Sequence, residues 1–141
     1  MAKKKETAKP YQVFVSHATA DKWLAKTLCE KIEESGASTF RDDRDIDGGD
    51  DIPERIRLAI KRSNELVVLL TPNSVDRPRV MFEVEAAWGR GGSLRIVPIL
   101  YQVEVDTIPA IIKSKKAIHL NECDAYFAEV KARVGMHHEQ D

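Results

Sequence analysis

The sequence contains little of what marks several specialised protein classes. Its two cysteines, Cys29 and Cys123, are too few for a disulfide framework and fit no zinc-binding spacing. The longest apolar run, residues 66–70, is far shorter than the roughly 20 residues that cross a membrane. The basic start, Met-Ala-Lys-Lys-Lys, has no apolar core behind it and so does not resemble a secretory signal. We therefore expect a cytoplasmic protein that does not act at a membrane.

The sequence also lacks an excess of charge of either sign. Its 22 Lys and Arg side chains face 23 Asp and Glu, a formal net charge of −1, which argues against nucleic acid as the main partner. With 141 residues, 43% of them hydrophobic, the chain suffices for one packed domain. We expect a flexible basic arm over residues 1–10, the domain over 11–134 and a polar tail over 135–141.

Short apolar runs alternate with helical patterns along the domain. Strands are predicted over residues 11–15, 37–40, 65–70, 95–100 and 117–120. Within the strand 95–100, Pro98 favours an edge position or a bulge. The first helix is expected to be capped by Thr19 and to end at Gly36, and Asp50 or Asp51 can cap the second. Later helices are predicted over 79–88, 110–112 and 124–134. This alternation indicates an α/β fold, a parallel sheet with helices on both faces.

In such folds, ligands bind at the carboxyl ends of the strands. Three segments should meet there: residues 16–19 after the first strand, the acidic loop 41–51 after the second, and residues 71–83 after the third. One histidine, His17, one carboxylate, Glu83, and an acidic glycine-bearing loop can therefore converge at this edge.

Several common ligand cradles are missing. No Gly-x-Gly-x-x-Gly follows the first strand, and no Gly-x-x-x-x-Gly-Lys-[Ser/Thr] occurs, which disfavours a plain nucleotide-binding module. Residues 89–92 follow a helix, where their glycines simply end it. A phosphoacceptor domain needs an aspartate after the third strand, where this chain has Thr71, and no glycine joins the hydroxyls after the first strand to hold a flavin. We expect no metal site, because the histidines lack helical i, i+4 pairing: His17, His119, His137 and His138.

Spacing alone gives Glu83 an ordinary interpretation. Glu83 flanks the apolar stripe of its predicted helix, where a carboxylate is usually solvated or simply favourable near a helix N-terminus. Glu85 points roughly 200° away around that helix, so the two cannot act as a catalytic pair. The acidic loop likewise has the composition of any surface turn with helix caps.

Four segments together carry a resemblance to a known family. Val-Phe-Val-Ser-His at 13–17, followed by Ala20-Asp21, resembles the first box of TIR domains. Residues 41–52 look like their BB loop, residues 78–89 (Pro-Arg-Val-Met-Phe-Glu-Val-Glu-Ala-Ala-Trp-Gly) like the C helix of bacterial members, and 96–100 like their fourth strand. The resemblance covers residues 11–134 and implies a flavodoxin-like domain with a five-stranded parallel sheet.

The resemblance implies an enzyme that acts on NAD⁺. Many members hydrolyse or cyclise NAD⁺ at the nicotinamide–ribose bond, with NAD⁺ as substrate and no cofactor. The position that matches their catalytic glutamate is Glu83. Substrate-binding positions carry over to a second set of residues: Ser16, His17, Phe40, Asp42 and Arg79. Arg79 stands where the family usually has tryptophan, and it either contacts a phosphate or marks altered or lost activity.

The resemblance also implies self-association. Enzymatic members assemble through the BB loop, which here includes Asp45, Ile46, Asp47, Gly48, Gly49 and Asp50. The expected role is in bacterial immune signalling, such as antiphage defence, or as an effector acting on host cells. A separate sensor or downstream effector protein is then an expected partner. The alternative is a non-catalytic adaptor that works through the same loop. The sequence leaves open the product, the trigger and the oligomeric state at rest.

Overall fold

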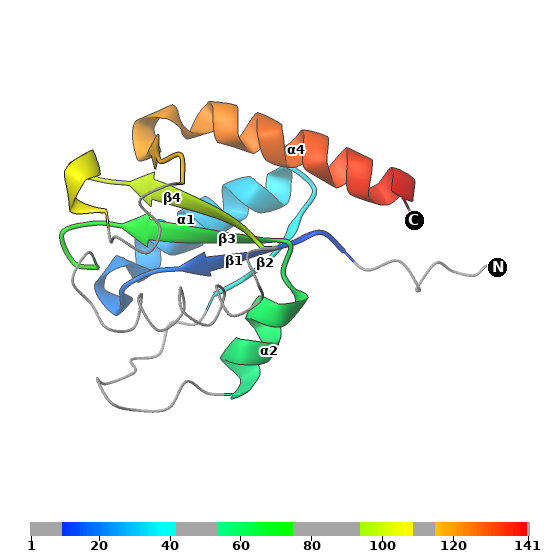
Figure 1. Ribbon diagram of the computed structural model, residues 1–141, viewed down its shortest axis with the longest axis horizontal. Helices are drawn as coiled ribbons and strands as arrows, with labels where there is room; N and C mark the ends of the chain where they lie inside the picture. Colours follow the sequence, from blue (N-terminus) through cyan, green and yellow to red (C-terminus); the bar gives the residue numbers. More distant parts are fainter. Residues whose placement is uncertain (1–9, 42–53, 75–93, 109–114, 141) are drawn as a thin grey trace.

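The computed structural model describes residues 10–41, 54–74, 94–108 and 115–140 (Figure 1). These residues form one parallel sheet whose strands lie in the order β2-β1-β3-β4-β5. The strands are β1 (Gln12–Ser16), β2 (Ser38–Phe40), β3 (Glu65–Leu70), β4 (Arg95–Leu100) and β5 (Ile118–His119). The helices are α1 (Lys22–Glu34), α2 (Glu54–Arg62) and α4 (Cys123–Gln140), with 3₁₀ turns η1 (Thr19–Asp21), η2 (Val105–Thr107) and η4 (Leu120–Glu122). The predicted fold class is confirmed, while the helices expected over 79–88 and 110–112 lie outside the described residues.

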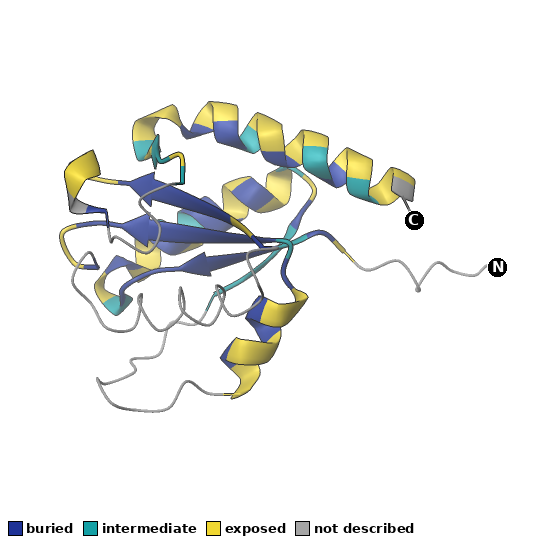
Figure 2. Cartoon of the chain, in the orientation of Figure 1, coloured by how far each residue is buried: buried dark blue, intermediate teal, exposed yellow. Residues whose placement is uncertain are grey.

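Strand β3 forms the centre of the sheet. All six of its residues are buried, as Figure 2 shows, because β1 and β4 pair with it on either side and helices cover both faces. Alternate side chains point to opposite faces, so Val67 and Leu69 join one core cluster while Leu66, Val68 and Leu70 join the other. A strand buried in this way needs the continuous apolar run that the sequence provides.

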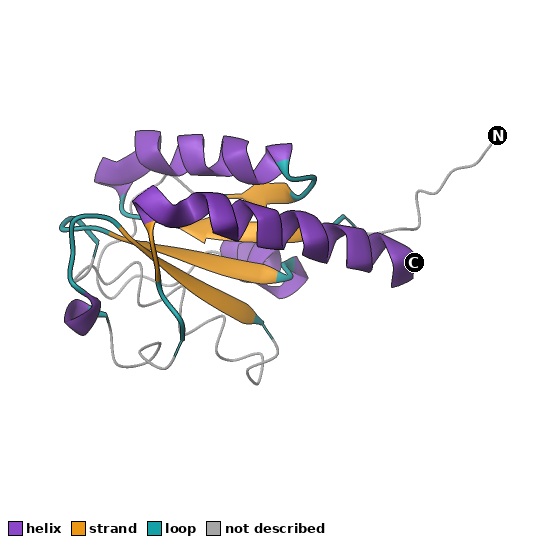
Figure 3. Cartoon of the chain, turned by 90° about the horizontal axis from the view of Figure 1, so that it is seen from above, coloured by secondary structure: helices purple, strands orange, loops and turns teal. Residues whose placement is uncertain are grey.

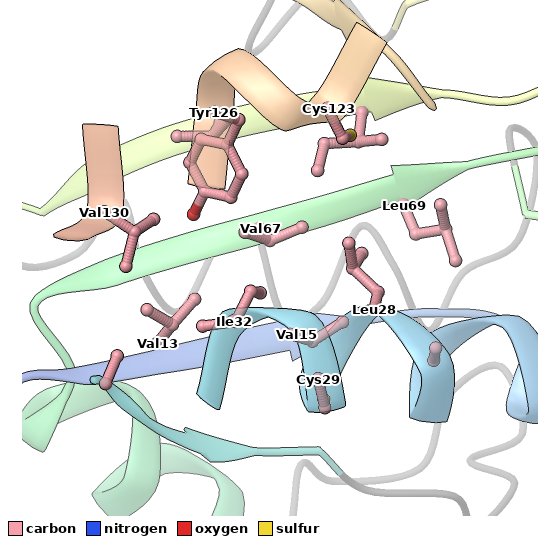
Figure 4. Packing of buried hydrophobic residues seen from close by; sticks show 14 of the residues in the cluster. Val13, Val15, Leu28, Cys29, Ile32, Val67, Leu69, Cys123, Tyr126 and Val130 are labelled. Carbon is pink, nitrogen blue, oxygen red and sulfur yellow. The ribbon is translucent and has the colours of Figure 1, made fainter. Parts of the chain in front are cut away.

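Helices α1 and α4 cover one face of the sheet, and α2 packs on the other (Figures 1 and 3). In the first layer, Leu28 and Ile32 of α1 and Tyr126 and Val130 of α4 meet over Val67 of β3 (Figure 4). In the second layer, the buried residues of α2 are Ile56, Ala59 and Ile60, which form one apolar stripe. Burying each large apolar side chain stabilises the fold by about 1.5–3 kcal/mol.

The first helix begins differently from the prediction. Thr19 does not cap it, because Thr19–Asp21 forms the turn η1, in which the cap position is Ala18 and no side chain makes a capping bond. The predicted end is confirmed: Gly36 follows α1 with a φ of 103°, a conformation that side chains other than glycine rarely adopt.

The last helix is longer than predicted. Helix α4 continues past Val134 to Gln140, through residues that the sequence analysis assigned to a tail. The ring of His137 lies edge-on to the ring of Tyr11, with 5.5 Å between centroids. This contact with the start of β1 gives the added turns a packing partner, which helical periodicity within the segment could not reveal.

The expectation for Pro98 is also corrected. Strand β4 lies between β3 and β5 and is not an edge strand of the sheet. However, β5 pairs only with Ile99 and Leu100. Within the described residues, the side of β4 facing β5 therefore has no paired strand at Pro98, and the missing backbone N–H breaks no ladder there.

A buried carboxylate joins the sheet to α4. Glu65, at the start of β3, is fully buried and accepts hydrogen bonds from the Tyr11 hydroxyl and from the Tyr126 hydroxyl, the latter at 2.8 Å. Arg133 donates from Nε at 2.6 Å and from Nη2 at 3.3 Å. Burial opposes the charge of the guanidinium, but the bonds with Glu65 raise the pKa of Arg133 overall. We call these four residues the Glu65 cluster.

We expect substitution by alanine to have opposite effects at Gly135, which lies within α4, and at Gly36, which follows α1 and packs near Val134 of α4. Gly135 lies within the helix, and an added Cβ meets no atom within 4 Å, so Gly135→Ala should raise the free energy of unfolding by about 0.5–1 kcal/mol. Gly36→Ala should lower it by about 1–2 kcal/mol, because of the positive φ and because its Cβ would lie 3.2 Å from Val134 Cγ1. Urea unfolding measures both, and changes of the same sign would contradict the packing described.

The Glu65 cluster should make stability fall above about pH 10. Burial first, and then Glu65, raise the pKa values of Tyr11 and Tyr126 well above the usual value near 10. Both tyrosines keep their protons when folded but release them when unfolded, so stability is complete below about pH 10 and falls above it. The wild type should therefore lose free energy of unfolding between pH 8 and pH 11. In Tyr126→Phe this loss should be smaller by about 1.4 kcal/mol, because one of the two titrating hydroxyls is gone.

Urea unfolding at the two pH values measures this loss. Tyr101→Phe is the matched control, because it removes a hydroxyl from an exposed side chain and should keep the wild-type pH dependence. An equal effect of the two substitutions would contradict the role given to Tyr126.

Candidate functional site

The strand order reverses direction between the carboxyl ends of β1 and β3. From β1 the chain passes through α1 to β2 on one side, whereas from β3 it goes on to β4 on the other. The connections therefore diverge at this point, which is where ligands bind in open α/β sheets. Strand β1 ends at Ser16, paired with Val68 of β3, and β3 ends at Leu70 before a turn over residues 71–74.

Two predicted site residues, Ser16 and His17, lie at the end of β1. Both side chains are buried, with exposed fractions of 0% and 1%. The ring nitrogen Nδ1 of His17 is 2.7 Å from the backbone oxygen of Ala18. Because a carbonyl can only accept, this contact assigns the proton to Nδ1 and makes Nε2 the acceptor in the neutral ring. His17 is thus a hydrogen-bonding group held in a fixed orientation.

A third predicted residue, Phe40, ends β2 beside them. Its ring is half-buried and lies 5.3 Å, centroid to centroid, from the ring of Phe14 on β1. The register Phe14↔Phe40 places the two residues opposite each other on paired strands. Phe40 therefore offers an apolar aromatic wall at the same edge as Ser16 and His17.

A polar network that the sequence analysis missed joins the two strand ends. The buried carboxylate of Asp21 in η1 accepts a 2.6 Å hydrogen bond from the Thr71 hydroxyl and a 2.9 Å bond from Asn73 Nδ2. Ser74 Oγ donates to Leu69 O at 2.8 Å and accepts from the Thr71 N–H at 2.9 Å. No local sequence signal could have revealed this network, because Asp21 lies about 50 residues from Thr71 and Asn73 along the chain. Only the fold brings these residues together.

This network affects which groups at these strand ends are available for chemistry. Both oxygens of Asp21 are engaged by neutral donors, so its carboxylate holds the two loops together. Among the described residues, the predicted binding residues Ser16, His17 and Phe40 lie near these strand ends, and their role in ligand binding stays a prediction. They can bind and orient a ligand, while stabilisation of a developing positive charge requires another carboxylate.

The remaining predicted site residues lie outside the described residues. They are the substrate-binding candidates Asp42 and Arg79, the catalytic candidate Glu83, and the assembly loop from Asp45 to Asp50. The first of these segments begins at residue 42, two residues after the end of β2, and the second begins at residue 75, directly after Ser74. The described flanks of both segments therefore lie at the carboxyl edge where Ser16, His17 and Phe40 were found.

A cavity of about 310 Å³ continues this edge beyond β3. It lies at the carboxyl ends of β4 and β5, and its lining is Leu100, Tyr101, Gln102, His119, Leu120 and Asn121. None of these was predicted as a site residue. Their polar groups come from the residues just after β4, including Gln102 with a φ of 60°, and from the end of β5.

The cysteines are poor candidates for a nucleophile. Cys29 and Cys123 are both buried and unbridged. Burial, followed by the charge of Asp124, raises the pKa of the Cys123 thiol to about 11, so little reactive thiolate forms near neutral pH. Over the described ranges, no three His, Cys, Asp or Glu side chains group in a way that could hold a metal ion, and none of the described helices could span a membrane.

A family model described as the TIR domain matches residues 13–133. The 2' cyclic ADP-D-ribose synthase BtTIR of Bacteroides thetaiotaomicron is 26% identical over 106 residues, which are 73% of this chain and 37% of that protein. The NAD(+) hydrolase TirS of Staphylococcus aureus is 30% identical over 105 residues, 71% of this chain and 37% of that protein. The chain thus spans less than two fifths of the length of these curated relatives.

A solved structure shares the fold. The metazoan TIR-STING receptor from C. gigas, in complex with 2',3'-cGAMP, superposes with a TM-score of 0.67 at 22% identity. The match covers 86% of this chain and 39% of that one.

We expect Asp21→Ala to lower the free energy of unfolding by about 2–3 kcal/mol, because the buried Thr71 hydroxyl and the Asn73 amide lose a charged acceptor. Glu30→Ala, on the exposed face of α1, is the matched control and should change it by less than about 0.5 kcal/mol. Urea unfolding at pH 7 measures both. Equal, small effects would show that the network does not hold the strand ends together.

Proposed function

The chain belongs to the TIR domain family, and from this premise we propose that it is an enzyme that cleaves NAD⁺ between nicotinamide and ribose. The observation that carries the proposal is similarity to two enzymes. One relative is an NAD(+) hydrolase and another is a 2' cyclic ADP-D-ribose synthase, and each matches more than 70% of this chain. Both reactions begin with loss of nicotinamide, so the proposal concerns the step that they share.

The chemistry needs a carboxylate but no acid. When the C1′–N bond breaks, its electron pair goes to the pyridinium nitrogen, and nicotinamide leaves as a neutral base. The positive charge passes to the ribose, which becomes oxocarbenium-like. A carboxylate beside the ring stabilises that charge. We assign this role to Glu83, because its position matches the catalytic glutamate of the family and Asp21 is already engaged by Thr71 and Asn73.

The described residues would bind the substrate. In this proposal Phe40 provides an aromatic wall for a planar ring of NAD⁺, and Ser16 and His17 hydrogen-bond to it at the end of β1. We also assign Asp42 and Arg79 to the substrate site, where the guanidinium of Arg79 would pair with a phosphate. The fixed orientation of the His17 ring supports its role as an oriented hydrogen-bonding group.

The second step decides the product. If water attacks C1′ and gives up a proton, the product is ADP-ribose. If a hydroxyl of the same molecule attacks and gives up its proton, the product is a cyclic ADP-ribose. The names of the relatives include both outcomes, so the proposal extends to a hydrolase with cyclase activity.

We include in the proposal activation by self-association through the loop that contains Asp45–Asp50, and a role in bacterial immune signalling or as a host-directed effector. A non-catalytic adaptor working through the same loop is the alternative, which Arg79 in place of the family's usual tryptophan favours. Since the chain spans 37% of each relative, the proposal describes the activity of this domain.

The test is nicotinamide release from NAD⁺ by the purified protein at several concentrations, with products separated by chromatography. Glu83→Ala should lower the rate by at least about 100-fold, because the charge-stabilising carboxylate is lost. Glu85→Ala is the matched control: it removes the same charge two residues away and should leave the rate within about 3-fold of wild type. Circular dichroism checks that both variants are folded.

The outcomes separate the two functions. A rate per molecule that rises with protein concentration supports activation by assembly. Loss of activity in the Glu85 variant alone would move the catalytic role to that residue. No release by the wild type at any concentration, with or without a crowding agent, would favour the adaptor.

A further inference from the structure

A second pocket lies at the opposite edge of the sheet, at the amino ends of the strands. We call it the amino-edge pocket; its volume is about 470 Å³ and its lining is Pro10, Leu58, Lys61, Arg62, Ser63, Asn64 and His137. Figure 1 shows the three parts that supply it, the end of α2, the start of β1 and the last turns of α4, at one end of the sheet. We propose that this pocket binds a small phosphorylated molecule with an apolar part, as in a nucleotide.

The charge of the lining favours an anion. Lys61 and Arg62 stand in the last turn of α2, and His137 adds an imidazole from α4. No carboxylate belongs to the lining, and within the described ranges neither Lys61 nor Arg62 forms a salt bridge. Two cationic side chains without an acidic partner at one concave surface are suited to an anion of more than one charge.

These cations are not needed to satisfy the end of α2. Basic residues often cover the carbonyl groups that a helix exposes at its C-terminus. Here Ala59 O already accepts hydrogen bonds from Ser63 Oγ at 2.7 Å and from Gln12 Nε2 at 3.2 Å. The Ser63 N–H donates to Ile60 O at 3.1 Å. Neutral groups therefore satisfy these two carbonyls, and the charges of Lys61 and Arg62 are available to a ligand.

Neutral donors on the lining are oriented by the fold. Asn64 Oδ1 accepts from the Gln12 N–H at 3.0 Å, and the Asn64 N–H donates to Gln12 O at 2.8 Å. With its amide oxygen held by β1, Asn64 keeps its Nδ2 group as a donor, and in the described part of the chain this nitrogen makes no hydrogen bond. A fixed amide donor beside two cations is what an anionic oxygen needs.

The pocket also has an apolar wall and a suitable size. Pro10 and Leu58 form that wall, and 39% of the Leu58 side-chain surface is exposed. His137 is held edge-on to Tyr11, which belongs to the Glu65 cluster. The volume of about 470 Å³ lies within the range of small-molecule sites. Charge at one end and apolar surface at the other match a phosphorylated molecule that carries a ring.

The test is titration of the full chain with ADP, inorganic pyrophosphate and adenosine, followed by calorimetry and by the NMR signals of the His137 ring. ADP and pyrophosphate should bind and shift these signals, and adenosine should not. Lys61→Ala/Arg62→Ala should weaken ADP and pyrophosphate binding at this pocket at least about 10-fold. Arg55→Ala/Arg57→Ala is the matched control: it removes the same charge from the same helix outside the lining and should change binding less than about 2-fold.

Three results would overturn the proposal: no shift of the His137 signals with ADP or pyrophosphate, equal weakening in the two double variants, or ADP binding that Lys61→Ala/Arg62→Ala does not change. The last result would place ADP at the carboxyl edge. The inference is independent of the proposed function, because the pocket lies at the opposite ends of the strands, so failure of either one leaves the other standing.

Discussion

The fold depends on one buried carboxylate and the groups that neutralise it. Glu65 has no exposed surface, yet it stands at the start of the central strand and accepts hydrogen bonds from Tyr11, Tyr126 and Arg133. An isolated charge in that position would cost several kcal/mol, so β3 can be buried only if β1 and α4 bring their donors to it. Replacing one partner would leave an uncompensated charge, and the cluster therefore links three parts of the chain that lie far apart in sequence.

A buried carboxylate lies at each end of the parallel strands. At the amino ends the Glu65 cluster joins α4 to the sheet, and Tyr11 extends this contact to His137 at the rim of the amino-edge pocket. At the carboxyl ends Asp21 plays a similar part with neutral donors, joining η1 to the turn after β3. Because Asp21 is used in this way, the proposal gives the chemistry to Glu83 and the binding of substrate to Ser16, His17 and Phe40.

Sequence reasoning anticipated the elements better than the contacts between them. The apolar run 65–70 predicted a doubly buried strand, and Gly36 predicted the end of α1, because both signals are local. Thr19 was wrong as a cap, since the turn at residues 19–21 depends on how the chain leaves β1. The full length of α4 was missed, since it depends on Tyr11. Of the predicted substrate site, Ser16, His17 and Phe40 lie at the predicted edge, and their roles remain predictions, as do those of Glu83, Asp42 and Arg79.

The sequence by itself determined the fold class and the single parallel sheet, and it predicted the carboxyl edge as the place for a ligand. These follow from hydrophobic periodicity, strand-to-helix alternation and the rule that parallel strands end on one side. Only the tertiary structure decided which polar residues act as pairs. Asp21 meets Thr71 across 50 residues and Glu65 meets Arg133 across 68, and Lys61 and Arg62 share a pocket with His137. Such pairings have no local signature, because a side chain's partner is set by packing and not by spacing along the chain.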